Sequence, residues 1–322
     1  MVEPALFGIV AIGRNEGDRL VLALRSIPPG VPVVYVDSDS TDGSVAFARS
    51  AGAEVVELDL SIPFTAARGR NAGAAALLDS HPDITFIQFI DGDCEVEKGW
   101  LDAAAQFLAG HPGVAAVCGR RRERYPERSF YNRMCDIEWN TPVGEAGACG
   151  GDAMFRVTAL RQAQFYDAAI IAGEEPELCG RLRSLGWKIW RIDAPMTIHD
   201  ADMHHWRQWW MRTVRSGFGY AQVWWKTRRG AGDPLYGREL FSAIFWTLGI
   251  LGVAVALTLL IGPPGLLAAP AIWFAQFARL SRREGAGKAA LLLGGKLAEL
   301  IGAARFLIAR MLHRRQGAIF YK

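Results

Sequence analysis

Short runs of apolar and β-branched residues alternate with segments of helical character along the first 120 residues of the chain. Five runs predict strands, at residues 6–12, 31–36, 53–58, 85–90 and 114–118. The intervening segments predict helices at residues 18–26, 44–51, 66–78 and 99–109. Strands that alternate with helices indicate an α/β fold, in which a mostly parallel sheet is flanked by helices.

The last third of the chain is more apolar than the rest. Residues 240–262 carry no charge and are roughly long enough to cross a bilayer, and residues 266–280 form a shorter apolar run after a Pro-Pro-Gly turn signal. We therefore expect a transmembrane hairpin of two spans over residues 240–283, with buried core helices as the alternative. Arginine pairs at both outer ends, 228–229 and 282–283, predict that these ends face the cytoplasm.

Two further segments predict helices at the membrane surface. Tryptophans recur at helical spacing between residues 204 and 230 and are mixed with arginines, a pattern typical of an interfacial helix. Residues 287–322 are apolar but interrupted by charges, so we expect them to lie on the membrane or dip into it. These segments divide the chain into a catalytic domain (1–203), an interfacial helix (204–230), the hairpin and the C-terminal helix.

Composition excludes several classes of protein. The chain has 322 residues, of which 51% are hydrophobic and 21% charged, so it is not disordered. A formal net charge of +3 gives no reason to expect a nucleic-acid partner. The five cysteines show no CxxC spacing and favour a reducing compartment over a disulfide framework or a zinc site. The N-terminus predicts a strand and a loop, and no signal peptide.

Polar clusters follow three of the predicted strands. The sequence GRNE occupies residues 13–16, DSDSTD occupies 37–42, and DGD occupies 91–93. Ligands of parallel sheets bind at the carboxyl ends of the strands, so these clusters predict one site at one edge.

Within the last cluster, Asp91 and Asp93 share a side of an extended segment, because side chains two residues apart point the same way. Two close carboxylates suit Mg²⁺ or Mn²⁺ that also binds phosphate oxygens. The alternative is that Asp93 caps the helix that begins near residue 97. For Asp37, at its strand end, we expect hydrogen bonds with a base or a sugar, and for Arg70 a planar contact that braces a nucleotide.

The order of these motifs resembles glycosyltransferase family 2, inverting enzymes of the GT-A fold, and here the membrane-anchored bacterial type. The segments that carry the resemblance are GRNE, VDSDSTDGS (36–44), ARGRNAG (67–73), DGD, GACGGDAMFR (147–156) and GEEPELCGRLRSLGWKI (173–189). The chain departs from the family at Ser38, where a second acid is common, and at Glu175, where an aspartate is commoner.

The resemblance implies roles for particular residues. It implies nucleotide binding by Arg14, Glu16, Asp37, Asp39, Arg70 and Asp91. It implies a donor and acceptor pocket at Gly150, Gly151 and Asp152, and a Mn²⁺ or Mg²⁺ site formed by Asp93, Asp91 and His199. The catalytic base is Glu175, with Glu174 beside it as the other candidate; a dipole-favoured helix start is the alternative explanation for either.

The implied activity is inverting transfer of one sugar from a UDP- or GDP-sugar to a hydroxyl of a lipid-linked or polysaccharide acceptor. It would take place on the cytoplasmic face of the inner membrane, in polysaccharide biosynthesis of the cell envelope. Residues 207–210 (RQWW) do not match the QxxRW motif of processive relatives, which argues against long-chain synthesis. The alternatives are transfer to polyprenyl phosphate, which needs no base at Glu175, and a non-catalytic scaffold that binds nucleotide-sugar or glycan. A homo-oligomer is left open.

Overall fold

The computed structural model describes residues 6–230 and 234–312. These residues divide into two compact units, of which the first ends at His204 and the second begins at His205. Residues 1–5 of the predicted catalytic domain and 313–322 of the predicted C-terminal helix lie outside the described residues.

The first unit is built on a sheet of nine described strands in the order β3-β2-β1-β4-β8-β6-β9-β5, with β7 paired to β9. The strands are β1 (Phe7–Gly13), β2 (Val33–Asp37), β3 (Glu54–Glu57), β4 (Phe86–Asp91), β5 (Cys94–Val96), β6 (Val114–Glu123), β7 (Gly144–Ala146), β8 (Ala153–Arg156) and β9 (Lys188–His199). All five strands predicted from the sequence are confirmed.

The predicted α/β fold with flanking helices is confirmed, and its sheet contains antiparallel as well as parallel strands. Strands β3, β2, β1 and β4 are parallel, but β8 lies antiparallel between β4 and β6. Strand β6 is parallel to β9, whereas β5 and β7 pair with β9 antiparallel. The added antiparallel strands have three or four residues each, too few to show a clear alternation of apolar and polar positions.

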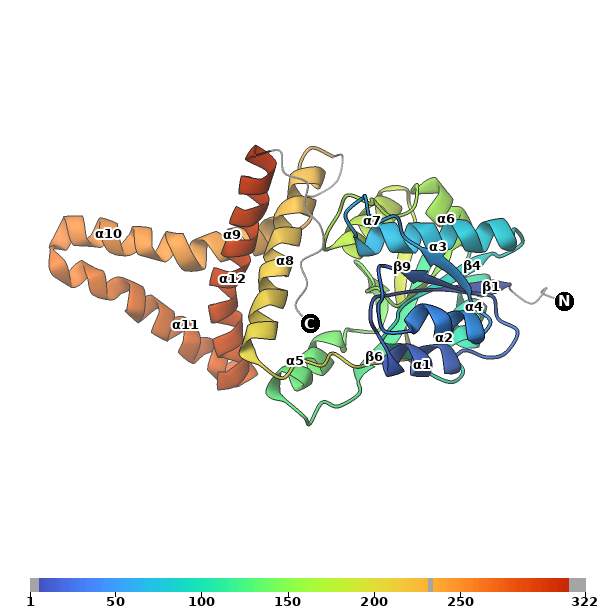
Figure 1. The fold of residues 1–322 in the computed structure, drawn as a ribbon. Coiled ribbons are helices and arrows are strands. Elements are labelled where there is room, and N and C mark those ends of the chain that lie inside the picture. The colour runs from blue at the N-terminus through green and yellow to red at the C-terminus, as the bar shows by residue number, and fades with distance from the viewer. Residues whose placement is uncertain (1–5, 231–233, 313–322) are drawn as a thin grey trace. The chain divides into compact units, whose positions relative to one another are not determined.

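Helices cover both faces of this sheet (Figure 1). They are α1 (Asp18–Arg25), α2 (Ser44–Ser50), α3 (Ala66–Ser80), α4 (Trp100–Gly110), α5 (Phe130–Trp139), α6 (Val157–Gln162) and α7 (Glu174–Ser184). Helix α3 approaches β1 closely: a Cβ added at Gly73 would lie 2.3 Å from Val10. Trp100 of α4 donates a hydrogen bond of 2.8 Å to Gln88 on the opposite face. The four helices predicted from the sequence are confirmed, and α5 was not predicted.

The second unit consists of helices. After α8 (Trp206–Thr227), the segments α9 (Gly237–Ile244), a π-helical turn (Phe245–Gly249) and α10 (Ile250–Ile261) follow one another. A 3₁₀ turn (Pro263–Leu267) then leads into α11 (Ala268–Glu284), and α12 (Ala286–Met311) follows.

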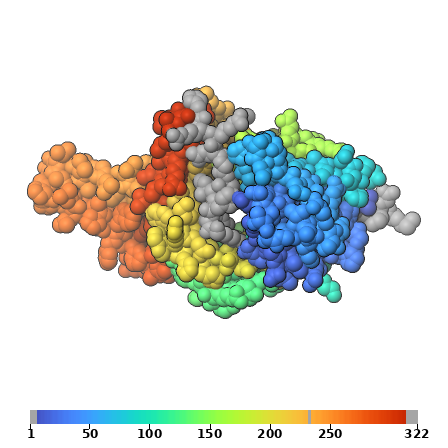
Figure 2. Space-filling view, viewed as in Figure 1, coloured from blue at the N-terminus to red at the C-terminus, as the bar shows by residue number. Residues whose placement is uncertain are grey.

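Within the described residues, 237–261 is the only helix that is long and apolar enough to cross a membrane. Side chains near the C-terminal end of this helix are strongly exposed, with Leu259 at 82% and Leu260 at 79%. This surface, formed by α10 and α11, is visible in Figure 2. The turn between α10 and α11 is tight, because a Cβ at Gly265 would lie 2.3 Å from the backbone nitrogen of Thr258. The second span of the predicted hairpin stays a prediction, because α11 does not meet the same criteria of length and apolarity.

Helices α8 and α12 pack along each other through glycines. A Cβ added at Gly302 would lie 2.0 Å from the carbonyl oxygen of Val214, and one at Gly217 would lie 2.1 Å from that of Glu299. The two helices run in the same direction, and both lie across the direction of α10 (Figure 1). Helix formation at 204–230 is confirmed, but the membrane-surface position of α8 and α12 stays a prediction.

Candidate active site

The carboxyl ends of β1, β2 and β4 form the edge at which the polar clusters meet. The parallel register pairs Gly13 with Asp37 on one side and Ile12 with Asp91 on the other. The loop that follows β1 lies against the DGD turn, because a Cβ added at Gly92 would lie 3.2 Å from Glu16. The three loops therefore adjoin one another, as parallel strands require.

Hydrogen bonds fix the loop that follows β2. The Asp37 carboxylate is 3% exposed and accepts bonds from the backbone nitrogen of Ser40 (2.8 Å) and the hydroxyl of Tyr35 (3.1 Å). Burial raises the pKa of Tyr35, so the phenol stays protonated and donates. Asp37 is thus held rigidly with its carboxylate at the strand end.

Two ion pairs, one exposed and one partly buried, occupy the outer part of the same edge. Arg14 contacts Asp39 at 3.3 Å, and both side chains are well exposed. Glu16 contacts Arg19 of α1 at 3.0 Å. The exposed Arg14–Asp39 pair contributes little to stability, so these two side chains can exchange partners for a ligand, whereas the Glu16–Arg19 pair is partly buried.

Arg70 is the centre of the site. Its side chain is 2% exposed and contacts three carboxylates, Asp91 at 3.0 Å, Glu174 at 2.9 Å and Glu175 at 3.0 Å. A guanidinium offers five donors in a planar fork, which suits it to join several acids at once. Arg70 thereby joins the start of α7 to the end of β4. Its predicted role in bracing a nucleotide stays a prediction, since the contacts described are with protein carboxylates.

The surroundings of Glu175 raise the pKa of its carboxyl group. Burial, together with the negative charge of Glu174, raises the pKa of Glu175 to about 7, and the charge of Arg70 offsets part of that rise. A carboxyl group with a pKa near neutrality can accept a proton and release it again under physiological conditions. This is what a general base requires.

Gly151 leaves the space that this cluster needs. A Cβ at Gly151 would lie 2.3 Å from Nη2 of Arg70 and 3.2 Å from Oε1 of Glu175, whereas a Cβ at Gly150 would have nothing within 4 Å. The glycine-rich segment therefore serves two purposes: Gly151 permits close packing, and Gly150 lies next to open space.

A second buried network lies on the other side of Asp91. Arg121 of β6 contacts Asp152 at 2.7 Å and Asp91 at 3.5 Å, and the hydroxyl of Thr197 donates to Asp152 at 2.7 Å. Burial alone would raise the pKa of Asp152, but Arg121 holds it below its usual value. Asp152 is 1% exposed and orients Arg121; its predicted place in the donor and acceptor pocket stays a prediction.

The metal site predicted at Asp93, Asp91 and His199 is divided by the structure. Asp93 Oδ2 lies 3.1 Å from Nε2 of His199, and these two side chains form one cluster of possible ligands with Cys94. Asp91 falls into another cluster, with Cys94 and Asp152. Both carboxylates of this other cluster already contact Arg121, which would repel a cation.

The cluster at Asp93 fits a divalent ion. The Nδ1 atom of His199 is buried and has no hydrogen-bond partner among the described residues. Burial raises the pKa of Cys94 far above its usual value, so its thiol stays protonated and is a poor ligand. A carboxylate and an imidazole remain, and they leave room for waters and phosphate oxygens in the coordination shell.

Two residues that the sequence did not suggest complete this part of the site. Trp139 of α5 stacks on the His199 ring, with centroids 4.8 Å apart and planes 16° apart. The guanidinium of Arg121 lies 5.3 Å from the centroid of Trp139. Arg121 lies in an arginine-rich segment, residues 120–133, whose composition alone does not point to a site. No periodic signal marks Trp139.

A pocket of about 200 Å³ opens beside Asp93. Its lining combines side chains from α1 with the segment after β6 and is formed by Asp18, Arg19, Leu22, Asp93, Glu95, Arg124, Tyr125, Arg128 and Asp200. The candidate ion ligand therefore borders a charged cavity.

Comparison with known proteins points to one family. The model of the family described as glycosyl transferase family 2 matches residues 14–162, the segment that contains Arg14, Asp37, Arg70 and the DGD motif. No curated protein sequence matches the chain.

Solved structures show the same fold. A mannosyltransferase from Pyrobaculum calidifontis, PcManGT in complex with GDP-Man and Mn²⁺, has a TM-score of 0.64 and 19% identity over 95% of this chain and 88% of that one. S. aureus TarS 1–349 has a TM-score of 0.50 and 13% identity over 96% and 92% of the respective chains. GalNAc-T7 with UDP, GalNAc and Mn²⁺ has a TM-score of 0.50 and 12% identity over 72% and 53%. At these identities the similarity shows a GT-A-type fold.

Proposed function

We propose that the protein transfers a sugar from a nucleoside diphosphate to an acceptor hydroxyl, because the glycosyl transferase family 2 model matches residues 14–162. The observation that carries this proposal is the contact of Arg70 with Asp91, Glu174 and Glu175, which joins the base candidates to the DGD motif. The solved structures of PcManGT with GDP-Man and GalNAc-T7 with UDP support a nucleotide-sugar donor.

Glu175 acts as the general base. Its ionised carboxylate takes the proton of the acceptor hydroxyl, and the oxygen attacks the anomeric carbon on the face opposite the leaving diphosphate. This single displacement inverts the configuration. Glu174 pairs with the same guanidinium as Glu175 and tunes its pKa, so Glu174 is the supporting acid.

Asp93 and His199 would hold the divalent ion. When bound, Mn²⁺ or Mg²⁺ supplies positive charge that stabilises the diphosphate leaving group. Trp139 fixes the plane of the His199 ring. Arg70 and Arg121 hold the carboxylate of Asp91, the first acid of the DGD motif. Through these contacts, the chain holds the acidic edge in one arrangement before the donor arrives.

The loops after β1 and β2 bind the nucleotide. Asp37 is rigidly oriented at its strand end and accepts a hydrogen bond from the base or the ribose. At the same edge, Arg14 and Asp39 form an exposed, exchangeable ion pair, and Glu16 forms a partly buried pair with Arg19; these three side chains bind the nucleotide with Asp37. Gly150, which has open space beside it, borders the donor and acceptor pocket.

The acceptor is lipid-linked or a polysaccharide, and the reaction takes place on the cytoplasmic face of the inner membrane. The apolar helix at 237–261 supports a membrane location. The arginine pairs at 228–229 and 282–283, at the two outer ends of the predicted hairpin, support this orientation. Such a transferase would act in cell-envelope polysaccharide synthesis.

Nucleotide release from a panel of UDP- and GDP-sugars, with Mn²⁺ and membrane extract as acceptor, tests the proposal. We expect turnover with at least one donor, and a loss of at least about 100-fold in Glu175→Gln, which removes the base. Glu177→Gln is unsuitable as a control because Glu177 is buried and pairs with Arg181 in the same helix. Glu145→Gln is the matched control, because the ion pair of Glu145 with Lys188 is exposed.

The possible outcomes separate the candidate functions. Full activity of Glu175→Gln with a polyprenyl-phosphate acceptor would indicate that a phosphate oxygen is the nucleophile. No turnover with any donor would favour a binding scaffold and overturn the proposed activity.

A further inference from the structure

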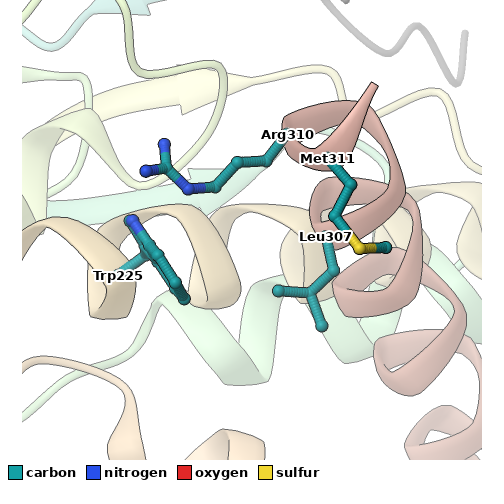
Figure 3. A pocket seen from close by; sticks show the side chains of 4 residues that line it. All are labelled: Trp225, Leu307, Arg310 and Met311. Atoms are coloured by element: carbon teal, nitrogen blue, oxygen red, sulfur yellow. The ribbon is translucent and has the colours of Figure 1, made fainter. Parts of the chain in front are cut away.

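The C-terminal ends of α8 and α12 enclose a cavity whose lining is largely apolar. It has a volume of about 460 Å³ and is lined by Trp225 of α8 and by Leu307, Arg310 and Met311 of α12. Figure 3 shows Trp225 on one side, Leu307 and Met311 on the other, and Arg310 extending from α12 toward the indole. Both helices belong to the second unit, so the cavity lies within one compact part of the chain.

Two guanidinium groups surround the indole of Trp225. The Cζ atom of Arg228 lies 3.5 Å from the ring centroid, and that of Arg310 lies 4.6 Å from it. Arg228 also donates a hydrogen bond to the carbonyl oxygen of Trp225. Arg310 lines the cavity itself, and Arg228 lies against the indole that forms its other side. Cation–π contacts hold both charges beside this ring without neutralising them.

These charges have no acidic counterpart in the described part of the chain, where neither Arg228 nor Arg310 forms an ion pair with a carboxylate. Partial desolvation and the positive charges of Arg229 and Arg310 lower the pKa of Arg228. Like charges gathered around one ring repel each other, so an anion that binds between them relieves an unfavourable arrangement.

The apolar surroundings indicate what kind of anion this is. Met311 is 69% exposed and Leu307 44% exposed, so hydrocarbon surface adjoins the guanidinium groups. The same unit carries the apolar helix at 237–261, and α8 and α12 lie across its direction, as helices on a membrane surface do (Figure 1). A free phosphate would leave the apolar lining in contact with water, whereas a lipid covers it.

We propose that this cavity binds an anionic phospholipid, with its phosphate between Arg228 and Arg310 and its acyl chains along Leu307 and Met311. Tryptophan and arginine together are typical of the interfacial layer, where both a phosphate and hydrocarbon are within reach. The site anchors one end of the α8–α12 pair to the anionic leaflet. The proposal rests on the proposed membrane location and does not depend on the transfer reaction.

Lipid binding to the detergent-solubilised full-length protein tests the site. Native mass spectrometry measures the affinity for phosphatidylglycerol and for phosphatidylcholine of the same chain length. We expect the wild type to prefer phosphatidylglycerol, and R228Q/R310Q to lose roughly 30-fold in affinity for it, at about fivefold per arginine. The matched control R282Q/R283Q removes two arginines from the end of α11 and should keep the preference. Circular dichroism confirms that each variant retains its helices.

Three other results of these binding measurements would overturn the proposal. Equal affinity of the wild type for both lipids, or an unchanged preference in R228Q/R310Q, would overturn it. Full competition by inorganic phosphate would show that the site takes a free anion, and would also overturn it. Sedimentation with phosphatidylcholine vesicles measures membrane association separately, so failure of the lipid site is distinguishable from failure of the membrane location.

Discussion

The charges around Glu175 predict opposite shifts in the pH dependence of catalysis for two substitutions. Glu174 raises the pKa of Glu175, and Arg70 lowers it. Replacing Glu174 with Gln therefore moves the acid limb of the rate profile to lower pH, because the base ionises more easily. Replacing Arg70 with Gln moves the limb to higher pH.

The magnitude follows from the titration of one carboxyl group. With a pKa of about 7, about a tenth of Glu175 is ionised at pH 6. Removal of a neighbouring like charge shifts such a pKa by about one unit, so about half of Glu175 is ionised at pH 6 in E174Q. Relative to its own plateau, the activity of E174Q at pH 6 is then about fivefold higher than that of the wild type. For R70Q the shift is upward by roughly 1–3 units.

The assay is kcat/KM for the best donor between pH 5 and pH 9, at constant ionic strength and saturating Mn²⁺. Arg68→Gln is the matched control, since Arg68 lies on the same helix and bonds to backbone carbonyls of the preceding loop. Loss of Arg70 leaves buried carboxylates unpaired and costs about 3–5 kcal/mol, so the fold of R70Q is checked by circular dichroism. E174Q carries the test if R70Q unfolds. An acid limb that stays at the same pH in E174Q would refute the assignment of Glu175 as the titrating base.

Three further outcomes follow from the same structure. In G151A, kcat/KM for the donor should fall by at least about tenfold, because the added methyl group displaces the guanidinium of Arg70. G150A should keep wild-type kcat/KM, and equal activity of the two variants would contradict this packing. G302A should lower the melting temperature by several degrees, since no space separates it from the backbone of α8, while G294A, which has open space around it on the same helix, should not; a scan of thermal unfolding decides. The free energy of unfolding of the wild type should fall as the pH rises from about 4.5 to 7, because the carboxyl group of Glu175 loses its proton at lower pH in the unfolded state than in the folded state. In urea titrations, Glu175→Gln should remove roughly 2–4 kcal/mol of that fall. An unchanged pH dependence would show that this carboxyl has an ordinary pKa in the folded state.

Local patterns were sufficient to predict most of the first unit. Strands such as Phe86–Asp91 are buried, largely apolar runs that end at a polar cluster. Thr65 caps α3 with its hydroxyl, as is common where a helix begins. The edge at which the clusters meet follows from the parallel register alone. The mixed order of the sheet does not, because β8 has four residues and its position between β4 and β6 depends on tertiary packing.

The electrostatics of the site could be predicted only in part. Arg70 was expected to brace a nucleotide, but the structure places it among three carboxylates from β4 and α7. Arg70 and Glu174 are 104 positions apart in the chain. No sequence pattern predicts that two residues so far apart will meet. Trp139 was missed for the same reason, since its contact with His199 exists only after β9 has passed beside β5.

The most direct measurement is the affinity for UDP and GDP with and without Mn²⁺, in the wild type and in Asp93→Ala. Asp18→Ala is the control, because Asp18 lines the same pocket but does not belong to the cluster of candidate ion ligands. Isothermal titration should show that Mn²⁺ strengthens nucleotide binding in the wild type and in Asp18→Ala, and that this gain is lost in Asp93→Ala while the weak metal-free binding remains. A gain from Mn²⁺ that persists in Asp93→Ala would contradict the assignment of this edge of the sheet as the site for the ion and the diphosphate.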